Sequence, residues 1–204
     1  MRGFVLLVLW MSTSSGHALD TAFIKVHFLY GSKPGAAYRD SEPKWFGGKL
    51  GGHVGIEVED GRILNFLPSG SFHVFGKKEN RHSRFAVHDH NAFYAMFGGA
   101  PDSMKRAVVK IPITRRQLLT VDSLSTAYLA RTPYDYAFFG MRCGAAAYDV
   151  LSRIDLLNTC GRATIVRKIF YPRKLRKHLF RKAVQQQWKV ERHPGSSRRK
   201  WERD

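Results

Sequence analysis

Residues 52–67 place the tightest constraint on the fold of this chain. Two apolar, β-rich runs, 52–59 and 62–67, flank an Asp60-Gly61 pair. Such a pair between two strand-like runs is a strong hairpin signal, because Asp and Gly tolerate the positive φ angles of a tight turn. The sequence therefore predicts an antiparallel hairpin in which the second strand returns toward the start of the first.

The remaining elements follow in the order strands first, helices later. Runs rich in β-branched and aromatic residues predict strands at 21–30, 71–75 and 106–113. Apolar residues at helical spacing predict helices at 91–98, from Thr114 to before Pro133, at 143–157 and at 173–188. Residues 31–48 are expected to form a loop and residues 77–90 a polar connector. This order is typical of an α+β fold, and residues 19–190 have the length of one domain.

The N-terminus has the features of a targeting segment. Arg2 precedes the apolar run 4–11, and Gly16-His17-Ala18 resembles a small-residue cleavage site. Eight apolar residues are too few to span a bilayer as a permanent helix, which needs about twenty. We therefore predict a signal peptide at 1–18 and a secreted or periplasmic protein; a buried first strand is the alternative.

Positive charge is concentrated at the C-terminal end. The chain has 34 Lys and Arg against 16 acidic residues, a net charge of +18, and residues 161–204 carry +12 of it. Residues 191–204 lack apolar periodicity, which predicts a basic disordered tail. A cationic segment on an exported protein fits an anionic cell-wall polymer or membrane surface better than a specific nucleic acid.

Cys143 and Cys160 are the two cysteines available as nucleophiles. Cys143 begins a predicted helix, where unpaired N–H groups and the helix dipole stabilise a thiolate. Cys160 follows that helix, where the dipole opposes ionisation. Position favours Cys143, although a free cysteine is often a small buried hydrophobic residue.

A thiol nucleophile needs a base, and His53 has the most suggestive position of the nine histidines. It follows Gly51-Gly52 and begins a predicted strand. Asn65 is the polar residue in the returning strand, and an asparagine inside an apolar strand needs a hydrogen-bond partner. His53 is its nearest candidate. His88 and His90 could form a metal pair, but two ligands without a third predict no metal site.

The residues quoted above resemble a known family. The run Gly52-His53-Val54-Gly55-Ile56-Glu57-Val58, the polar Asn65 twelve positions after the histidine, and Arg142-Cys143-Gly144-Ala145-Ala146 at a helix start are similar to circularly permuted NlpC-type papain-like cysteine enzymes. That group includes lecithin retinol acyltransferase-like proteins and secreted bacterial members. Arg142 departs from the asparagine that is common before the cysteine in this family.

The resemblance implies a papain-like fold, a small antiparallel sheet packed against helices, permuted so that histidine precedes cysteine. It implies Cys143 as nucleophile, His53 as base and Asn65 as the group that orients the imidazole, without a cofactor. Tyr134 and Tyr136 could support the site through a hydroxyl group.

Three functions remain open at this point. The leading expectation is a secreted or periplasmic hydrolase that cleaves amide bonds, such as those of cell-wall peptides. The second is an acyltransferase or thioesterase acting on lipid substrates. The third is a non-catalytic module that binds an anionic polymer or surface.

Overall fold

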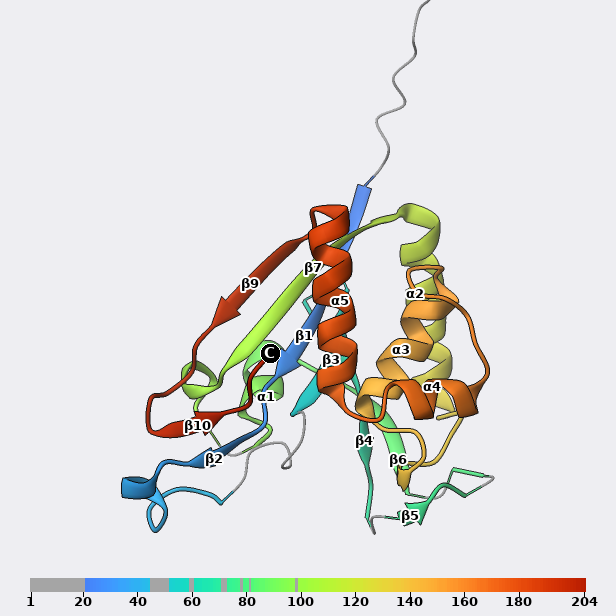
Figure 1. Ribbon diagram of the computed structural model, residues 1–204. Helices are drawn as coiled ribbons and strands as arrows, with labels where there is room; N and C mark the ends of the chain where they lie inside the picture. Colours follow the sequence, from blue (N-terminus) through green and yellow to red (C-terminus); the bar gives the residue numbers. More distant parts are fainter. Residues whose placement is uncertain are drawn as a thin grey trace, which may run out of the picture.

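The computed structural model describes residues 21–44, 52–58, 61–70, 73–77, 79–80, 82–97 and 99–204. The chain folds into an α+β structure (Figure 1). Its strands are β1 (Thr21–Leu29), β2 (Ser32–Pro34), β3 (His53–Glu57), β4 (Ile63–Pro68), β5 (His73–Phe75), β6 (Ser83–His88), β7 (Arg106–Thr114), β8 (Ala137–Phe139), β9 (Lys189–His193) and β10 (Arg199–Trp201). Its α-helices are α1 (His90–Ala95), α2 (Arg115–Ala130), α3 (Cys143–Arg153), α4 (Arg162–Lys168) and α5 (Pro172–Gln186), with 3-10 turns at Ala36–Tyr38 and Pro101–Ser103.

The described strands include a six-stranded sheet in the order β6-β4-β3-β1-β7-β9, with every neighbouring pair antiparallel. Helices α2, α3 and α5 lie together on one side of this sheet in Figure 1. The predicted α+β class with an antiparallel sheet packed against helices is confirmed.

Alternating side chains divide the central strands between two hydrophobic clusters. Val54 and Ile56 of β3 belong to the main core, together with residues of α2, α3 and α5. Ile63 of β4 belongs instead to a smaller cluster with Phe93 and Tyr94 of α1. Because successive strand residues point to opposite faces, α1 covers the face of the sheet that α3 does not.

The predicted hairpin is present as β3 and β4, with Gly55 opposite Asn65. Gly61, in the connection, has a φ of +75°, and Gly52, just before β3, has a φ of +64°. A Cβ atom on Gly52 would lie 1.6 Å from the carbonyl oxygen of Leu29. Glycine at position 52 therefore allows β3 to begin directly against β1, with His53 opposite Leu29.

Several of the predicted elements are confirmed. The capping box of Thr114 and Gln117 begins α2, which ends at Ala130 before Pro133. Strands β1 and β7 and helices α1, α3 and α5 lie within a few residues of the expected ranges. One prediction was wrong in the middle of the chain: the expected polar connector 77–90 contains β6, which pairs with β4 along its whole length.

The predicted disordered tail at 191–204 was also wrong. Strand β9 pairs with β7, and β10 pairs with β2 near the other end of the chain. Arg199 is buried, and its guanidinium group donates to Ser32 Oγ at 2.8 Å, Glu42 Oε2 at 2.9 Å and the Pro43 carbonyl at 2.9 Å. Ion pairs and edge pairing order this segment without an apolar stripe, which is why hydrophobic periodicity did not predict it.

The structure bears on one of the expectations about membranes and export and leaves the other as a prediction. No helix in the described part of the chain is long and apolar enough to cross a membrane. The predicted signal peptide, residues 1–18, lies outside the described residues.

Candidate active site

His53 and Asn65 form a buried hydrogen-bonded pair on neighbouring strands. Nε2 of His53 lies 3.0 Å from Oδ1 of Asn65, and both side chains are buried. Asn65 sits opposite Gly55, two residues along β3 from His53. Because Gly55 has no side chain, the ring of His53 and the amide of Asn65 can meet on the same face of the sheet.

The orientation of the Asn65 amide determines which nitrogen of His53 carries a proton. Its Nδ2 group donates to the carbonyls of Ile63 at 3.2 Å and Ala86 at 3.1 Å. Carbonyl oxygens only accept, so Nδ2 must face them and Oδ1 must face His53. Oδ1 accepts a hydrogen bond from Nε2–H, and in the neutral imidazole Nδ1 is then the basic nitrogen.

His88 extends this pair to a third residue, which the sequence analysis considered only as half of a metal pair. Its Nδ1 lies 2.9 Å from Asn65 Nδ2, whose two hydrogens are shared among this nitrogen and the carbonyls of Ile63 and Ala86. His88 lies at the end of β6, opposite Ile63 of β4. The contact depends on the pairing of β6 with β4, which sequence reasoning missed because residues 77–90 were predicted as a connector.

Cys143 is the first residue of α3 and is 4% exposed. Its thiol interacts with the Tyr136 hydroxyl and with the backbone N–H groups of Val54 and Gly144. Burial raises the pKa of this thiol, while the Tyr136 hydrogen bond, the Arg142 charge and the two N–H groups oppose the increase. The helix start, Val54 and Tyr136 thus surround one sulfur atom with hydrogen-bond donors, as a thiolate requires.

The backbone of β3 connects Cys143 with His53. The N–H group that faces the thiol belongs to Val54, the residue that follows His53. The His53 ring itself packs against Phe93 and Phe97, with ring centroids 5.6 and 5.8 Å away. Among the hydrogen bonds of the described residues, none joins the His53 ring to the Cys143 thiol. The structure brings both predicted residues to the start of β3 but on opposite faces of the sheet: the His53 ring lies on the face that α1 covers, and the Cys143 thiol lies on the face that α3 covers.

Burial holds both groups neutral at pH 7. Burial lowers the pKa of His53 to about 4, although the hydrogen bond to Asn65 opposes this decrease. Since burial raises the pKa of Cys143 in the same region, the resting pair is a thiol and an imidazole. An imidazole in this form can act as a general base.

The two predicted supporting tyrosines have different surroundings. Tyr136 contacts the Cys143 thiol through its hydroxyl group. Tyr134 packs edge-on against the rings of Phe66 and Phe85, and its buried hydroxyl has no hydrogen-bond partner among the described residues. The structure therefore places Tyr136, and not Tyr134, at the candidate site.

Arg142, where the resembling family commonly has asparagine, stacks on an aromatic cluster. Its guanidinium lies 3.9 Å from the ring centre of Phe170 and 4.8 Å from that of Tyr171. The side chain caps no N–H group of α3. Its positive charge lowers the pKa of Cys143, so it partly offsets burial of the thiol.

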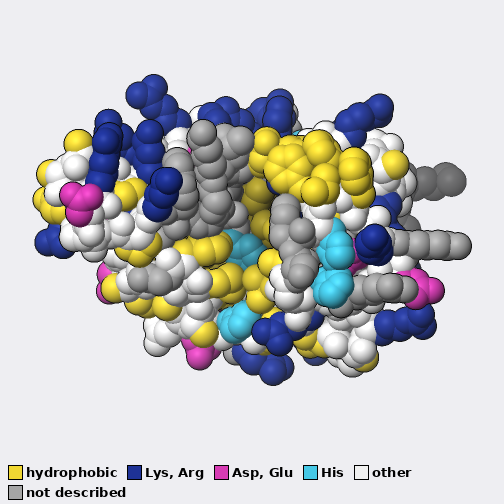
Figure 2. All heavy atoms as spheres, turned by 90° about the horizontal axis from the view of Figure 1, so that it is seen from below, with side chains coloured by type: hydrophobic (Ala, Val, Ile, Leu, Met, Phe, Trp, Pro, Cys, Tyr) yellow, Lys and Arg dark blue, Asp and Glu magenta, His cyan; other side chains and the backbone are white. Residues whose placement is uncertain are grey.

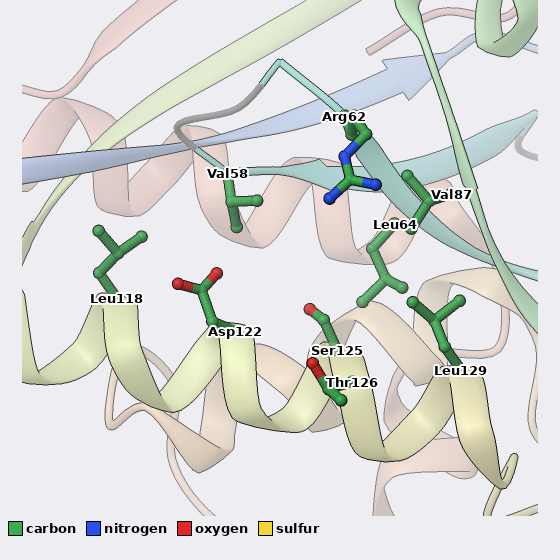
Figure 3. A pocket seen from close by; sticks show the side chains of 9 residues that line it. All are labelled: Val58, Arg62, Leu64, Val87, Leu118, Asp122, Ser125, Thr126 and Leu129. Carbon is green, nitrogen blue, oxygen red and sulfur yellow. The ribbon is translucent and has the colours of Figure 1, made fainter.

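A cavity of about 370 Å³ lies away from these residues. It separates α2 from the β3–β4 hairpin and β6, and Arg62 and Asp122 point into it from opposite sides (Figure 3). None of its lining residues belongs to the Cys143 or His53 surroundings. We therefore take the chemistry at the start of β3, and not this cavity, as the candidate site.

Comparison of the chain with protein-family models, with curated proteins and with solved structures finds no match.

Proposed function

We propose that this protein is a papain-like cysteine hydrolase, permuted so that the base precedes the nucleophile, in which Cys143 forms an acyl-enzyme. Two observations support the proposal: the Cys143 thiol lies at the start of α3 against the N–H of Val54, and the preceding residue of β3, His53, is hydrogen-bonded to Asn65. A nucleophile beside a base that a third group orients is the arrangement that acyl transfer requires.

The proposed reaction uses the groups as they are protonated at rest. Nδ1 of His53 accepts the thiol proton while Sγ attacks the carbonyl carbon of the substrate. His53 then donates this proton to the leaving amine, and the C–N bond breaks. In the second half, His53 takes a proton from water, the hydroxide attacks the thioester, and the thiol is regenerated with a free carboxylic acid.

The N–H groups near the thiol have a second use in this scheme. The backbone N–H of Cys143 lies at the start of α3, and the N–H of Val54 faces the same sulfur. Both are suitable donors for the oxyanion that forms on the attacked carbonyl. The transfer requires the His53 ring to turn from the face of the sheet that α1 covers toward Sγ at the start of β3, so the proposed reaction includes a change in the packing of Phe93 and Phe97 against this ring.

We propose amide bonds of cell-wall peptides as the substrate class, because the predicted export and the papain-like residues support it together. Purified mature protein should release peptides from purified cell wall. Cys143→Ser and His53→Ala should each lower this activity at least about a thousandfold, as removal of a member of a catalytic triad does. Cys160→Ser is the matched control and should keep full activity. Full activity of the Cys143→Ser protein would contradict the proposal.

One observation favours lipid esters or thioesters as a second candidate substrate class. Phe75 and Phe139 stack at 5.6 Å and are 69% and 54% exposed. They continue through Phe138 and Phe170 to Arg142, next to Cys143. β5 lies at the lower end of the molecule in Figure 1, and the view from below in Figure 2 shows hydrophobic side chains grouped on this face near Lys and Arg side chains.

An exposed aromatic group beside the nucleophile would suit an acyl chain with an anionic headgroup. Two assays run in parallel distinguish the substrate classes: fatty-acid release from anionic phospholipid vesicles and peptide release from cell wall. The variant Phe75→Ser should lower fatty-acid release only, because β5 carries no proposed catalytic group. An equal effect on both assays would argue against the lipid substrate.

A further inference from the structure

A second polar cluster lies on the same face of the sheet as His53, built around Glu57. Its Oε2 atom lies 2.6 Å from His27 Nε2 and 2.7 Å from His90 Nε2. These three ligand atoms come from β3, β1 and the start of α1, and all lie within 4.8 Å of one another. Neither the hydrophobic core nor the proposed hydrolysis accounts for this convergence.

Neighbouring side chains hold two of the three groups, His27 and Glu57, in place. Nε2 of His27 donates to the Glu57 carboxylate at 2.6 Å, and Nδ1 of His27 lies 2.6 Å from the Tyr94 hydroxyl. A bound cation would replace the Nε2 proton, and the Tyr94 oxygen would then accept a hydrogen bond from Nδ1–H. The second oxygen of Glu57, Oε1, accepts from Lys25 Nζ at 2.6 Å. A hydrogen bond on the other atom of each ligand is the usual support around a protein metal site.

Charge and access also suit a cation. His27 and Glu57 are buried, whereas the His90 side chain is 47% exposed and borders solvent. One carboxylate and two imidazoles therefore meet at a point that solvent can reach from the His90 side.

We infer that His27, Glu57 and His90 form a binding site for a divalent transition-metal ion of the zinc class. Two imidazole nitrogens and one carboxylate oxygen are typical zinc ligands, and three protein ligands leave a fourth position open. Ligand atoms around a tetrahedral zinc are about 3.4 Å apart, given metal–ligand bonds of about 2.0–2.2 Å. The Glu57 oxygen lies 2.6 and 2.7 Å from the two histidine nitrogens, so small side-chain rotations that move these atoms apart would admit the ion.

The site would connect α1 to the central strands. His90 begins α1, whose Phe93 packs against the His53 ring. A metal ion bound at His27, Glu57 and His90 would therefore hold in place the helix that covers the proposed base. This inference goes beyond the proposed hydrolysis and does not depend on it.

A zinc-binding assay tests the inference. It uses the full mature chain, purified without a histidine tag and treated with a chelator to remove bound metal. We expect one equivalent of Zn²⁺ in competition with a chromogenic chelator, and visible absorption bands of tetrahedral type with Co²⁺. At a hundredfold excess of Zn²⁺ over Kd, Tm should rise by about 5–10 °C.

Two variants and one control make the test specific. His90→Ala should lower zinc affinity by more than about a hundredfold. Loss of a residue that only hydrogen-bonds to a metal ligand already lowers metal affinity about 10–100-fold, and His90 is itself a ligand. Tyr94→Phe, which keeps the ring, should lower it by about tenfold or more. His178→Ala changes a histidine of α5 outside the cluster and should bind as the wild type does. Absence of binding by the wild-type protein, or equal affinity of the wild-type and His90→Ala proteins, would overturn the site.

Discussion

Nε2 of His53 donates to Oδ1 of Asn65 over 3.0 Å, and the two carbonyls that accept from Asn65 Nδ2 prevent the amide from turning over. This pair leaves Nδ1 of His53 as the basic nitrogen. Asn65 therefore has one clear task in the proposed mechanism, which is to hold the tautomer and the orientation of the imidazole.

Loss of the Asn65 amide should impair catalysis less than loss of His53. We expect Asn65→Ala to lower kcat/KM about tenfold to a hundredfold, because the base remains but is no longer oriented. Asn65→Asp should restore part of the rate and raise the pKa of His53, since a carboxylate stabilises the imidazolium. Kinetics against pH, with histidine titration by NMR, measures both effects. Unfolding of Asn65→Ala would instead indicate a structural role.

The hairpin and its two polar residues could be predicted from the sequence because they depend on local geometry. A tight turn at Gly61 sets the register, and the register places Asn65 near His53. The position of Cys143 at the start of a helix was equally local and is confirmed.

Contacts set by distant pairing could not be predicted in the same way. Glu57 meets His27 across the pairing of β3 with β1, and His90 joins them through the placement of α1. The histidine pair of 88 and 90 was noticed, but its members separate: His88 bonds Asn65 and His90 bonds Glu57. The spacing of polar residues along the sequence does not show which of them meet across neighbouring strands.

Acidification should destabilise the fold through His53. Its folded pKa is about 4, below the ordinary value of 6.5, so the unfolded chain binds the proton first as the pH falls. Stability is therefore complete above pH 6.5 and is lost between pH 6.5 and 4, with a decrease of about 2 kcal/mol from pH 7.5 to pH 5.

Urea unfolding at both pH values measures this loss. The variant His53→Gln should show a smaller loss, though not zero, because burial also lowers the pKa of His27. An unchanged loss in His53→Gln would contradict the assignment to His53.

Gly55→Ala should destabilise the protein at the centre of the hairpin. An added Cβ would lie 2.4 Å from Ile63 Cγ2 and 2.8 Å from Phe93 Cε2. We expect a loss of about 1–3 kcal/mol from overpacking, with a displaced Phe93 ring beside His53. Chemical denaturation checks this, with Gly76→Ala as control, because a Cβ there finds its nearest atom at 3.8 Å. Equal effects of the two substitutions would argue against the packing explanation.

Arg199→Ala should lower stability by about 3 kcal/mol, because it leaves Glu42 without its partner in a partly buried site. Removal of residues after Glu191 should cost at least as much, since it also removes the pairing of β10 with β2. Lys200→Ala, at the neighbouring exposed position, should stay within about 0.5 kcal/mol of the wild type. A truncated protein as stable as the full chain would restore the earlier expectation of a dispensable tail.

The reaction rates of the two cysteines with an electrophilic peptidyl probe test the central claim most directly. Cys160 is half-buried and Cys143 is buried, so accessibility alone makes Cys160 the faster thiol. If Cys143 is the nucleophile that His53 activates, peptide mapping at pH 7 should find Cys143 labelled about a hundredfold faster than Cys160. The preference should disappear in His53→Ala. Faster labelling of Cys160 in the wild type, or the same Cys143 rate in His53→Ala, would contradict the account.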